Sequence, residues 1–299
     1  AIEVIDPNGR YGDGPDETIL IPAVQGVHNG GRIDIAYGCG NDKLLKPLIV
    51  VEGINAPEWG NYSFSDFYTK LDLETDLLRE ELENEGYDLV FIDFGHGADY
   101  LEKNKLVVIE AIEKINELKE QNMSPYQNVV LGLSMGAILA RLALVDMENT
   151  PGQDHDSRLY ISFDGEHHGA NIPLGYQYLV EHLGNAYITS TDRVRDFIPD
   201  VDDGLNVLNS PTARQMLIYQ TVTNQSLFFD FQDMLYQAGY PQETRNGSVS
   251  NGNQAANSQP FSPGDKFLNI DNQNSWVGVI LGTGYHVFGT GSKFDIDVW

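Results

Sequence analysis

Ser134 is the residue in this sequence best placed to do chemistry, because it stands at the centre of Gly132-Leu133-Ser134-Met135-Gly136. The apolar run 128–133 leads directly into it, and a helix-like stretch over 136–147 follows at once. A serine on such a strand-to-helix turn is strained and lifts its hydroxyl above a sheet edge, where it can attack a carbonyl carbon. An ordinary helix N-cap serine between two glycines is the alternative. Because strand, turn and helix are in register, we expect Ser134 to be a nucleophile.

A nucleophilic serine needs N–H groups that hold the negative charge developing on the attacked oxygen. The residue after the nucleophile, Met135, is expected to supply one of them. A second is expected from Ile54, because Gly53 closes an earlier apolar run over 48–53 and lets the chain turn there. Gly53 and the following Asn55 are therefore expected to line the pocket. A plain strand-ending glycine turn is the alternative.

Asp164 is the candidate for the carboxylate that orients a catalytic base. It ends the apolar run 158–163, which is the next such run after the one that leads into the serine. A later run over 248–253 offers amides but no carboxylate, which favours Asp164. A structural aspartate that caps its loop through backbone hydrogen bonds fits the pattern equally well.

Two histidines are candidates for the general base. His286 follows the order serine, acid, histidine along the chain, although an ordinary strand histidine fits its surroundings as well. His167 lies three residues after Asp164 and is expected near the site. His96 and His168 follow the ends of two predicted strands and are expected to line the pocket. The choice of base stays open, with His286 slightly favoured.

The elements that must position these residues alternate between short apolar runs and amphipathic helical stretches. This alternation predicts a parallel, doubly wound sheet with helices on both faces, in which ligands bind beyond the carboxyl ends of the strands. The predicted strands cover 48–53, 88–94, 128–133 and 158–163, and the predicted helices cover 66–85, 105–121 and 136–147.

Two segments lie outside this alternation. Residues 1–47 form a β-rich lead-in with strand-like runs at 18–24 and 32–37, and the periodicity leaves open whether they are a separate module or extend the main sheet. Residues 170–242 contain helical patches, acidic loops and aromatic residues, which favours a cap or lid inserted within the main domain, 48–299.

The sequence resembles the secreted bacterial esterases and lipases of the α/β-hydrolase superfamily, most closely those of Bacteroidetes-type bacteria. The resemblance is carried by Gly132-x-Ser134-Met135-Gly136, by Gly53-Ile54, and by 164–173, which is similar to the Pro-His-x-Gly lipase motif. Ser210-Pro211-x-x-Arg214-Gln215-Met216-Leu217 and Gly239-Tyr240-Pro241 add to it. Glu52 stands where such lipases often have His, and Glu166 stands where they have Pro. The resemblance implies ester hydrolysis, and in those lipases the motif histidine supports its loop.

Composition excludes several classes of partner. A formal charge of −26 over 299 residues repels phosphate backbones, so nucleic acid is not expected as a partner. No apolar stretch reaches the roughly 18 residues that a membrane span needs, so stable membrane insertion is not expected. Cys39 is the only cysteine, which rules out a disulfide within the chain. The start at Ala1 and the composition favour a processed protein that is secreted or displayed on a bacterial cell surface.

The sequence therefore predicts a serine esterase that acts on a small-molecule or lipid ester through an acyl-enzyme, with no cofactor and no metal. Asp6, Asn8, Asp13 and Asp16 have calcium-like spacing but lack the closing glutamate, so a solvated acidic loop is the preferred interpretation there and at Asp200, Asp202 and Asp203. The alternative function is a non-catalytic binding or surface protein on the same scaffold. An imidazole within hydrogen-bond reach of Ser134 would favour the enzyme.

Overall fold

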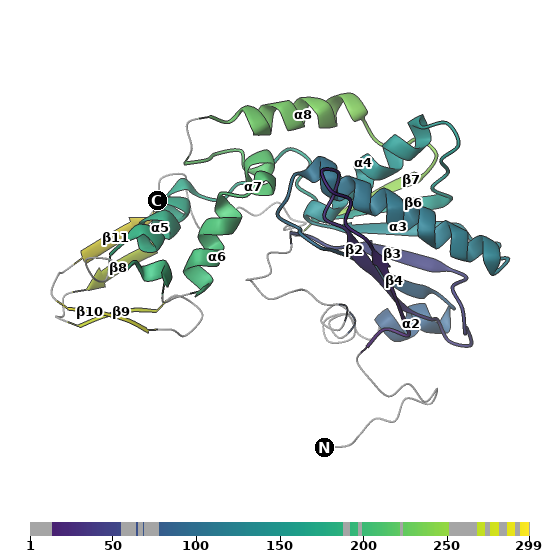
Figure 1. The fold of residues 1–299 in the computed structure, drawn as a ribbon, viewed down its shortest axis with the longest axis horizontal. Coiled ribbons are helices and arrows are strands. Elements are labelled where there is room, and N and C mark those ends of the chain that lie inside the picture. The colour runs from purple at the N-terminus through teal and green to yellow at the C-terminus, as the bar shows by residue number, and fades with distance from the viewer. Residues whose placement is uncertain are drawn as a thin grey trace, which may run out of the picture.

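A computed structural model describes residues 14–54, Phe64, Tyr68, 78–187, 192–196, 199–221 and 224–250, and beyond these the backbone of four short strands (Figure 1). Its centre is a seven-stranded sheet in the order β1-β2-β4-β3-β5-β6-β7. The strands are β1 Glu17–Ile21, β2 Gly31–Ala36, β3 Pro47–Val51, β4 Asp88–Phe94, β5 Asn128–Leu133, β6 Ser157–Phe163 and β7 Arg245–Val249.

The sheet is mostly parallel, as the sequence predicts. From β4 to β7 every neighbouring pair is parallel, whereas β2 is antiparallel to both β1 and β4. The lead-in therefore extends the main sheet. With the crossover between β3 and β4 and the helices between the parallel strands, this is a doubly wound, mostly parallel α/β fold, as expected from the sequence.

Side chains of β3 and β4 alternate between two apolar cores, as the period of two in a strand requires. Ile49, Val51, Val90 and Ile92 pack on one face with the helices α3 Leu101–Gln121 and α4 Met135–Asn149. Leu48, Val50, Leu89 and Phe91 face the other side, where they meet the helical residues Phe64 and Tyr68. The helix α2, Leu78–Asn84, follows these two. Both faces of the sheet are thus covered, which is why consecutive residues of β3, and of β4 from Leu89 to Ile92, are apolar.

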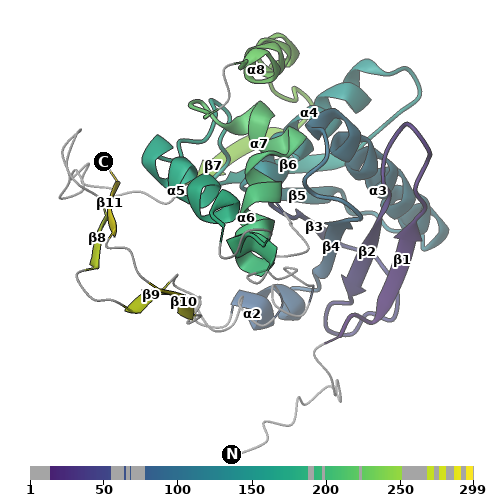
Figure 2. The same cartoon turned by 60° about the vertical axis from the view of Figure 1, so that its left-hand side comes forward.

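The segment between β6 and β7 is helical and lies beyond the carboxyl ends of the strands (Figures 1 and 2). It comprises α5 Leu174–Asn185, a 3₁₀ turn Val194–Asp196, α6 Pro199–Leu208, α7 Pro211–Met216 and α8 Ser226–Ala238. Side chains of α7 bind the turn after β4: Gln215 Oε1 accepts from Leu101 N at 2.8 Å, and Thr212 Oγ1 donates to Gly97 O at 3.2 Å. None of the helices in the described ranges is long and apolar enough to cross a membrane.

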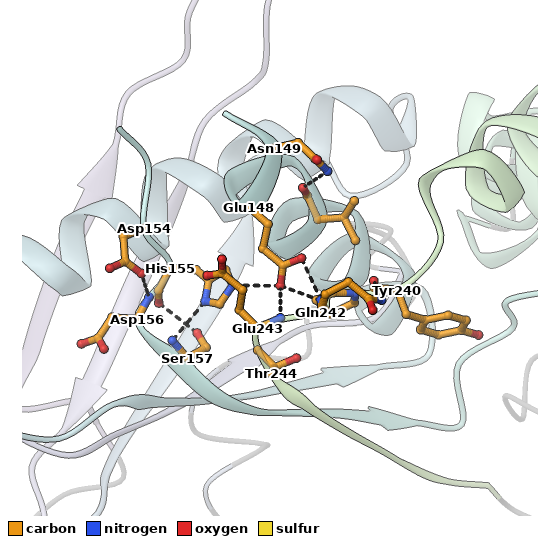
Figure 3. A network of polar contacts seen from close by, with 12 residues as sticks. Glu148, Asn149, Asp154, His155, Asp156, Ser157, Tyr240, Gln242, Glu243 and Thr244 are labelled. Atoms are coloured by element: carbon orange, nitrogen blue, oxygen red, sulfur yellow. Dashed lines mark hydrogen bonds and ion pairs between the residues drawn. The ribbon is translucent and has the colours of Figure 1, made fainter. Parts of the chain in front are cut away.

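The chain returns from α8 to the edge strand β7 through a polar network at the end of α4 (Figure 3). The Glu148 carboxylate accepts the backbone N–H groups of Gln242 and Glu243 at 2.8 Å and lies 3.3 Å from His155 Nε2. Nδ1 of the same ring accepts from Ser157 N at 3.0 Å. His155 is thus a loop residue whose side chain is almost fully buried, with 2% exposed.

Two further antiparallel pairs lie outside the seven-stranded sheet. β8, Leu268–Asn272, pairs with β11, Phe294–Val298, and β9, Trp276–Ile280, pairs with β10, His286–Thr290. Predicted site residue His286 opens β10 opposite Ile280. Its backbone is therefore in a strand, as the sequence indicated, and its side chain lies outside the described structure.

Candidate active site

Ser134 lies between β5 and α4 with φ 50° and ψ −121°. Non-glycine residues rarely adopt positive φ, and doing so costs roughly 1–3 kcal/mol, which the surrounding structure has to supply. The backbone N–H of Ser134 donates to Phe163 O of β6 at 2.9 Å, so the neighbouring strand holds the turn. The strained turn that the sequence predicts is present.

The two glycines of the motif are required by close backbone contacts. A Cβ on Gly132 would lie 2.3 Å from Ala137 Cα in α4, and one on Gly136 would lie 2.2 Å from Glu52 O and 2.3 Å from Val51 O of the β3 end. All three distances are far shorter than any real carbon contact. The absence of a side chain at these two positions therefore allows the start of α4 to pack directly on the sheet.

Ser134 does not act as a side-chain cap for α4. It occupies the N-cap position, but its hydroxyl makes no capping hydrogen bond. The first N–H groups of a helix have no partner inside the helix and carry partial positive charge. The buried Met135 begins α4, so its N–H belongs to this set, and the alternative of an ordinary N-cap serine is not what the structure shows.

The turn after β3 lies directly against the serine. A Cβ on Gly53 would lie 3.4 Å from Ser134 Cβ and 3.9 Å from its Oγ. Ile54 follows and is 37% exposed, and Asn55 lies outside the described residues. Glu52, which is 2% exposed, accepts from Phe94 N through Oε1 at 2.6 Å and so joins the ends of β3 and β4. The structure thus brings the predicted oxyanion segment next to Ser134.

The group in contact with the Ser134 hydroxyl is one that the sequence did not single out. Oγ lies 3.1 Å from Glu166 Oε1 and 3.2 Å from Oε2. Burial of Glu166 raises the pKa of its carboxyl, and the charge of Asp164 adds to this, whereas its own backbone N–H and the Ser134 hydroxyl lower it. The signal in the sequence was a carboxylate at the position where related motifs have proline.

Asp164 lies at the end of β6 with φ 49°, and its N–H donates to Val249 O of β7 at 2.7 Å. Within the described residues it forms no hydrogen bond with Ser134. It therefore lies at the carboxyl edge of the sheet, two residues from the glutamate that contacts the serine.

Both ring nitrogens of His167 have partners away from the serine. Nε2 lies 2.9 Å from Ser162 Oγ and Nδ1 lies 3.4 Å from Arg141 Nη1. Because a guanidinium can only donate, Nδ1 accepts and Nε2 carries the proton that is donated to Ser162. Burial, then the charges of Arg141 and His168, lower the pKa of His167 to about 4. In this arrangement the imidazole supports the loop 164–169.

The low pKa of His167 predicts a pH dependence of stability. The unfolded chain takes up this proton near pH 6.5, but the folded chain takes it up only near pH 4. The contribution of the neutral ring is therefore complete above pH 6.5 and is lost as the pH falls towards 4. Between pH 7 and 4.5 the free energy of unfolding of the His167→Gln variant should therefore fall by roughly 1–2 kcal/mol less than that of wild type. This figure allows for the partial exposure of the ring.

Urea unfolding of the two proteins at pH 4.5, 5.5, 6.5 and 7.5 measures this difference. The raised pKa of Glu166 makes the free energy of unfolding change with pH in the opposite direction. Glu166 is present in both proteins, so subtracting the free energy of unfolding of the variant from that of wild type removes its contribution. Parallel curves for the two proteins would show that the ring titrates alike in the folded and unfolded states.

The remaining pocket residues lie at separate places. His168 is exposed and, with His167, lines a cavity of about 570 Å³ formed with Arg141, Gln232, Tyr236 and Tyr240. Ser134 and Glu166 are not among the residues that line it. His96 lies exposed in the turn after β4, where its carbonyl accepts from Asp99 N.

No group of three or more His, Cys, Asp or Glu side chains that could hold a metal ion is found in the described ranges. Asp6, Asn8 and Asp13 of the calcium-like spacing lie outside them. Asp16 does lie within them, and its carboxylate accepts from Tyr37 N at 2.7 Å.

No known family model and no curated protein matches the sequence. Solved structures with a similar fold include the thermophilic carboxylesterase EstE1 from a metagenomic library, which is 13% identical with a TM-score of 0.44, covering 80% of this chain and 81% of that one. Brefeldin A esterase, a bacterial homologue of human hormone-sensitive lipase, is 17% identical with a TM-score of 0.40, covering 84% and 73%. Carboxyl esterase 2 of Tuber melanosporum is 16% identical with a TM-score of 0.39, covering 83% and 81%. The likeness concerns the fold alone.

Proposed function

We propose that this α/β-hydrolase-fold protein is a serine hydrolase of carboxylic esters, with Ser134 as its nucleophile. The observation that carries the proposal is the geometry of that serine. It is held at φ 50° between a buried strand and an uncapped helix start, with its hydroxyl in contact with a carboxylate instead of the helix. A strained backbone is maintained at a site when the surrounding structure over-determines it. The strained turn here places the hydroxyl at the start of α4, where the first N–H groups have no partner inside the helix.

The reaction follows from this arrangement. Ser134 Oγ attacks the ester carbonyl carbon, its proton passes to a nearby base, and the carbonyl oxygen becomes an oxyanion. The N–H groups of Met135 and Ile54 are the proposed donors to that oxyanion, since Met135 starts α4 and the Gly53 turn lies against the serine. Collapse releases the alcohol and leaves an acyl-enzyme, which water hydrolyses. The substrate class is a small-molecule or lipid ester.

A fluorophosphonate probe tests the proposal, because it forms a stable bond only with an activated serine. Peptide mass spectrometry after labelling is expected to find the probe on Ser134, and the protein is expected to hydrolyse short p-nitrophenyl esters. Replacement of Ser248, an exposed serine of β7, with alanine is the matched control and should leave labelling unchanged. A protein that neither takes the label nor cleaves these esters would favour the non-catalytic scaffold instead.

A further inference from the structure

Glu166 contacts the serine through both of its carboxylate oxygens, 3.1 and 3.2 Å from Ser134 Oγ. These distances lie within the range at which a general base takes a proton from the group it activates. A carboxylate can only accept, so the serine hydroxyl donates its hydrogen towards Glu166. The hydroxyl proton thus already points at this side chain.

The loop that carries Glu166 is fastened on both sides of it. On one side, Gly165 packs so closely on α4 that a Cβ there would lie 2.7 Å from Ala137 Cβ and 2.5 Å from Ser162 Oγ. On the other, the His167 ring is held by Ser162 and Arg141. Glu166 O accepts from Gly169 N at 2.9 Å, and Gly165 O accepts from His167 N at 3.0 Å. The carboxylate is therefore preorganised towards the serine and reaches it without a change in the backbone.

Arg141 of α4 holds the loop 164–169 in place through its contact with His167. It is 4% exposed, its Nη2 donates to Leu235 O at 2.7 Å, and its guanidinium stacks on Tyr240 at 3.8 Å from the ring centroid. Because Arg141 also contacts His167, the helix α8 and the loop 164–169 are both held by this one side chain. The position of Glu166 is thus set by contacts from α4, β6 and α8 together.

No imidazole in the described part of the chain forms a hydrogen bond with Ser134. His167 has both nitrogens occupied elsewhere. We infer that Glu166 is the general base of the reaction and takes the place that a histidine holds in the usual serine, acid, histidine arrangement. This inference rests on the proposed function, because it assigns a base to the same serine.

Glu166 alone can carry out every proton transfer of the reaction. Glu166 takes the hydroxyl proton as Ser134 Oγ bonds to the carbonyl carbon, and returns it to the alkoxide oxygen that leaves. It then takes a proton from the water that attacks the acyl-enzyme, and gives it back to Ser134 Oγ as the acid departs. Burial raises the pKa of the Glu166 carboxyl, which makes it a stronger base than an exposed glutamate.

The test compares Glu166→Gln, Glu166→Asp, Ser134→Ala, His286→Ala and the exposed control Glu120→Gln on p-nitrophenyl acetate. Loss of a general base costs about 10²- to 10⁴-fold in rate, so Glu166→Gln should lower kcat/KM by that factor and slow fluorophosphonate labelling of Ser134 equally. Glu166→Asp shortens the reach by one methylene and is expected to lose roughly 10- to 10²-fold. Because it keeps a carboxylate, it should also keep the fall of kcat/KM at acidic pH, which Glu166→Gln should lose.

Two results would overturn the inference. If Glu166→Gln stays within about fivefold of wild type while Ser134→Ala is inactive, the serine is the nucleophile but the base lies elsewhere, and a dead His286→Ala would identify it. If wild-type protein is not labelled at Ser134 and does not cleave the ester, the proposed function itself fails and the base assignment falls with it. The two failures are therefore distinguishable. Circular dichroism melts of each variant show whether a loss reflects unfolding.

Discussion

Replacing Ser134 with alanine or with glycine is expected to abolish ester hydrolysis equally, yet the glycine variant is expected to be the more stable of the two. Loss of a serine nucleophile lowers kcat by roughly 10⁴- to 10⁶-fold. Both variants lack Oγ, and both leave the Glu166 carboxylate without its serine partner. The two proteins differ only in whether residue 134 carries a Cβ.

The stability difference reports the backbone strain at residue 134. Alanine at φ 50° keeps the full penalty, whereas glycine adopts positive φ freely. Glycine also loses more entropy on folding, so a net gain of about 1 kcal/mol over alanine is expected, or about 2 °C in Tm for a chain of this length. Thermal melts and urea titrations of the two variants measure it. An alanine variant as stable as the glycine variant would show that the turn is not strained.

Local sequence was sufficient to predict this turn, because the sequence signals that indicate it lie within about ten residues of one another. The apolar run of β5, the two glycines and the start of α4 are contiguous in the chain, and each constrains the next. The parallel sheet was predictable for a similar reason. Strand and helix periodicity are local signals, and their alternation leaves few topologies to choose from.

Features set by distant contacts were not predictable. The helix α3 was expected from 105 but begins at Leu101, although Tyr100 offers no side-chain cap. Its first turn is held instead by Gln215, which lies 114 positions along the chain and accepts from Leu101 N. His155 is buried for the same kind of reason, since its partner Glu148 is itself held by the loop that follows α8.

The contact between Glu166 and Ser134 combines both kinds of information. Its loop follows the end of β6 and was recognised as part of the site, but the residue within it that turns towards the serine depends on packing. Gly165 sits against Ala137, and His167 is drawn away by Arg141, which leaves Glu166 as the residue facing Ser134. No pattern in the sequence encodes those two packing contacts, so histidines and not Glu166 were predicted as the base.

Replacing Gly136 with alanine is expected to destabilise the fold more than any surface change, because the new methyl group has no space. Its Cβ would lie 2.2 Å from Glu52 O and 2.3 Å from Val51 O. Both are backbone atoms at the end of β3, a central strand of the sheet, and neither can move aside like a flexible side chain. Overpacking usually costs 1–3 kcal/mol, and with backbone on the other side we expect roughly 3 kcal/mol or more.

Gly247→Ala is the matched control. Gly247 also lies in the sheet, in β7, but the nearest atom to an added Cβ is Tyr160 O at 3.9 Å, which is ordinary contact. Its free energy of unfolding should change by less than about 0.5 kcal/mol. Urea titration of both variants compares their free energies of unfolding. If Gly136→Ala does not fold, the loss is seen as a low yield of soluble protein. Because α4 and β3 must separate to admit the methyl group, any folded Gly136→Ala protein should also be labelled at Ser134 far more slowly. Equal stability of the two variants would show that α4 can shift on the sheet, and that the serine turn is held less tightly than its contacts indicate.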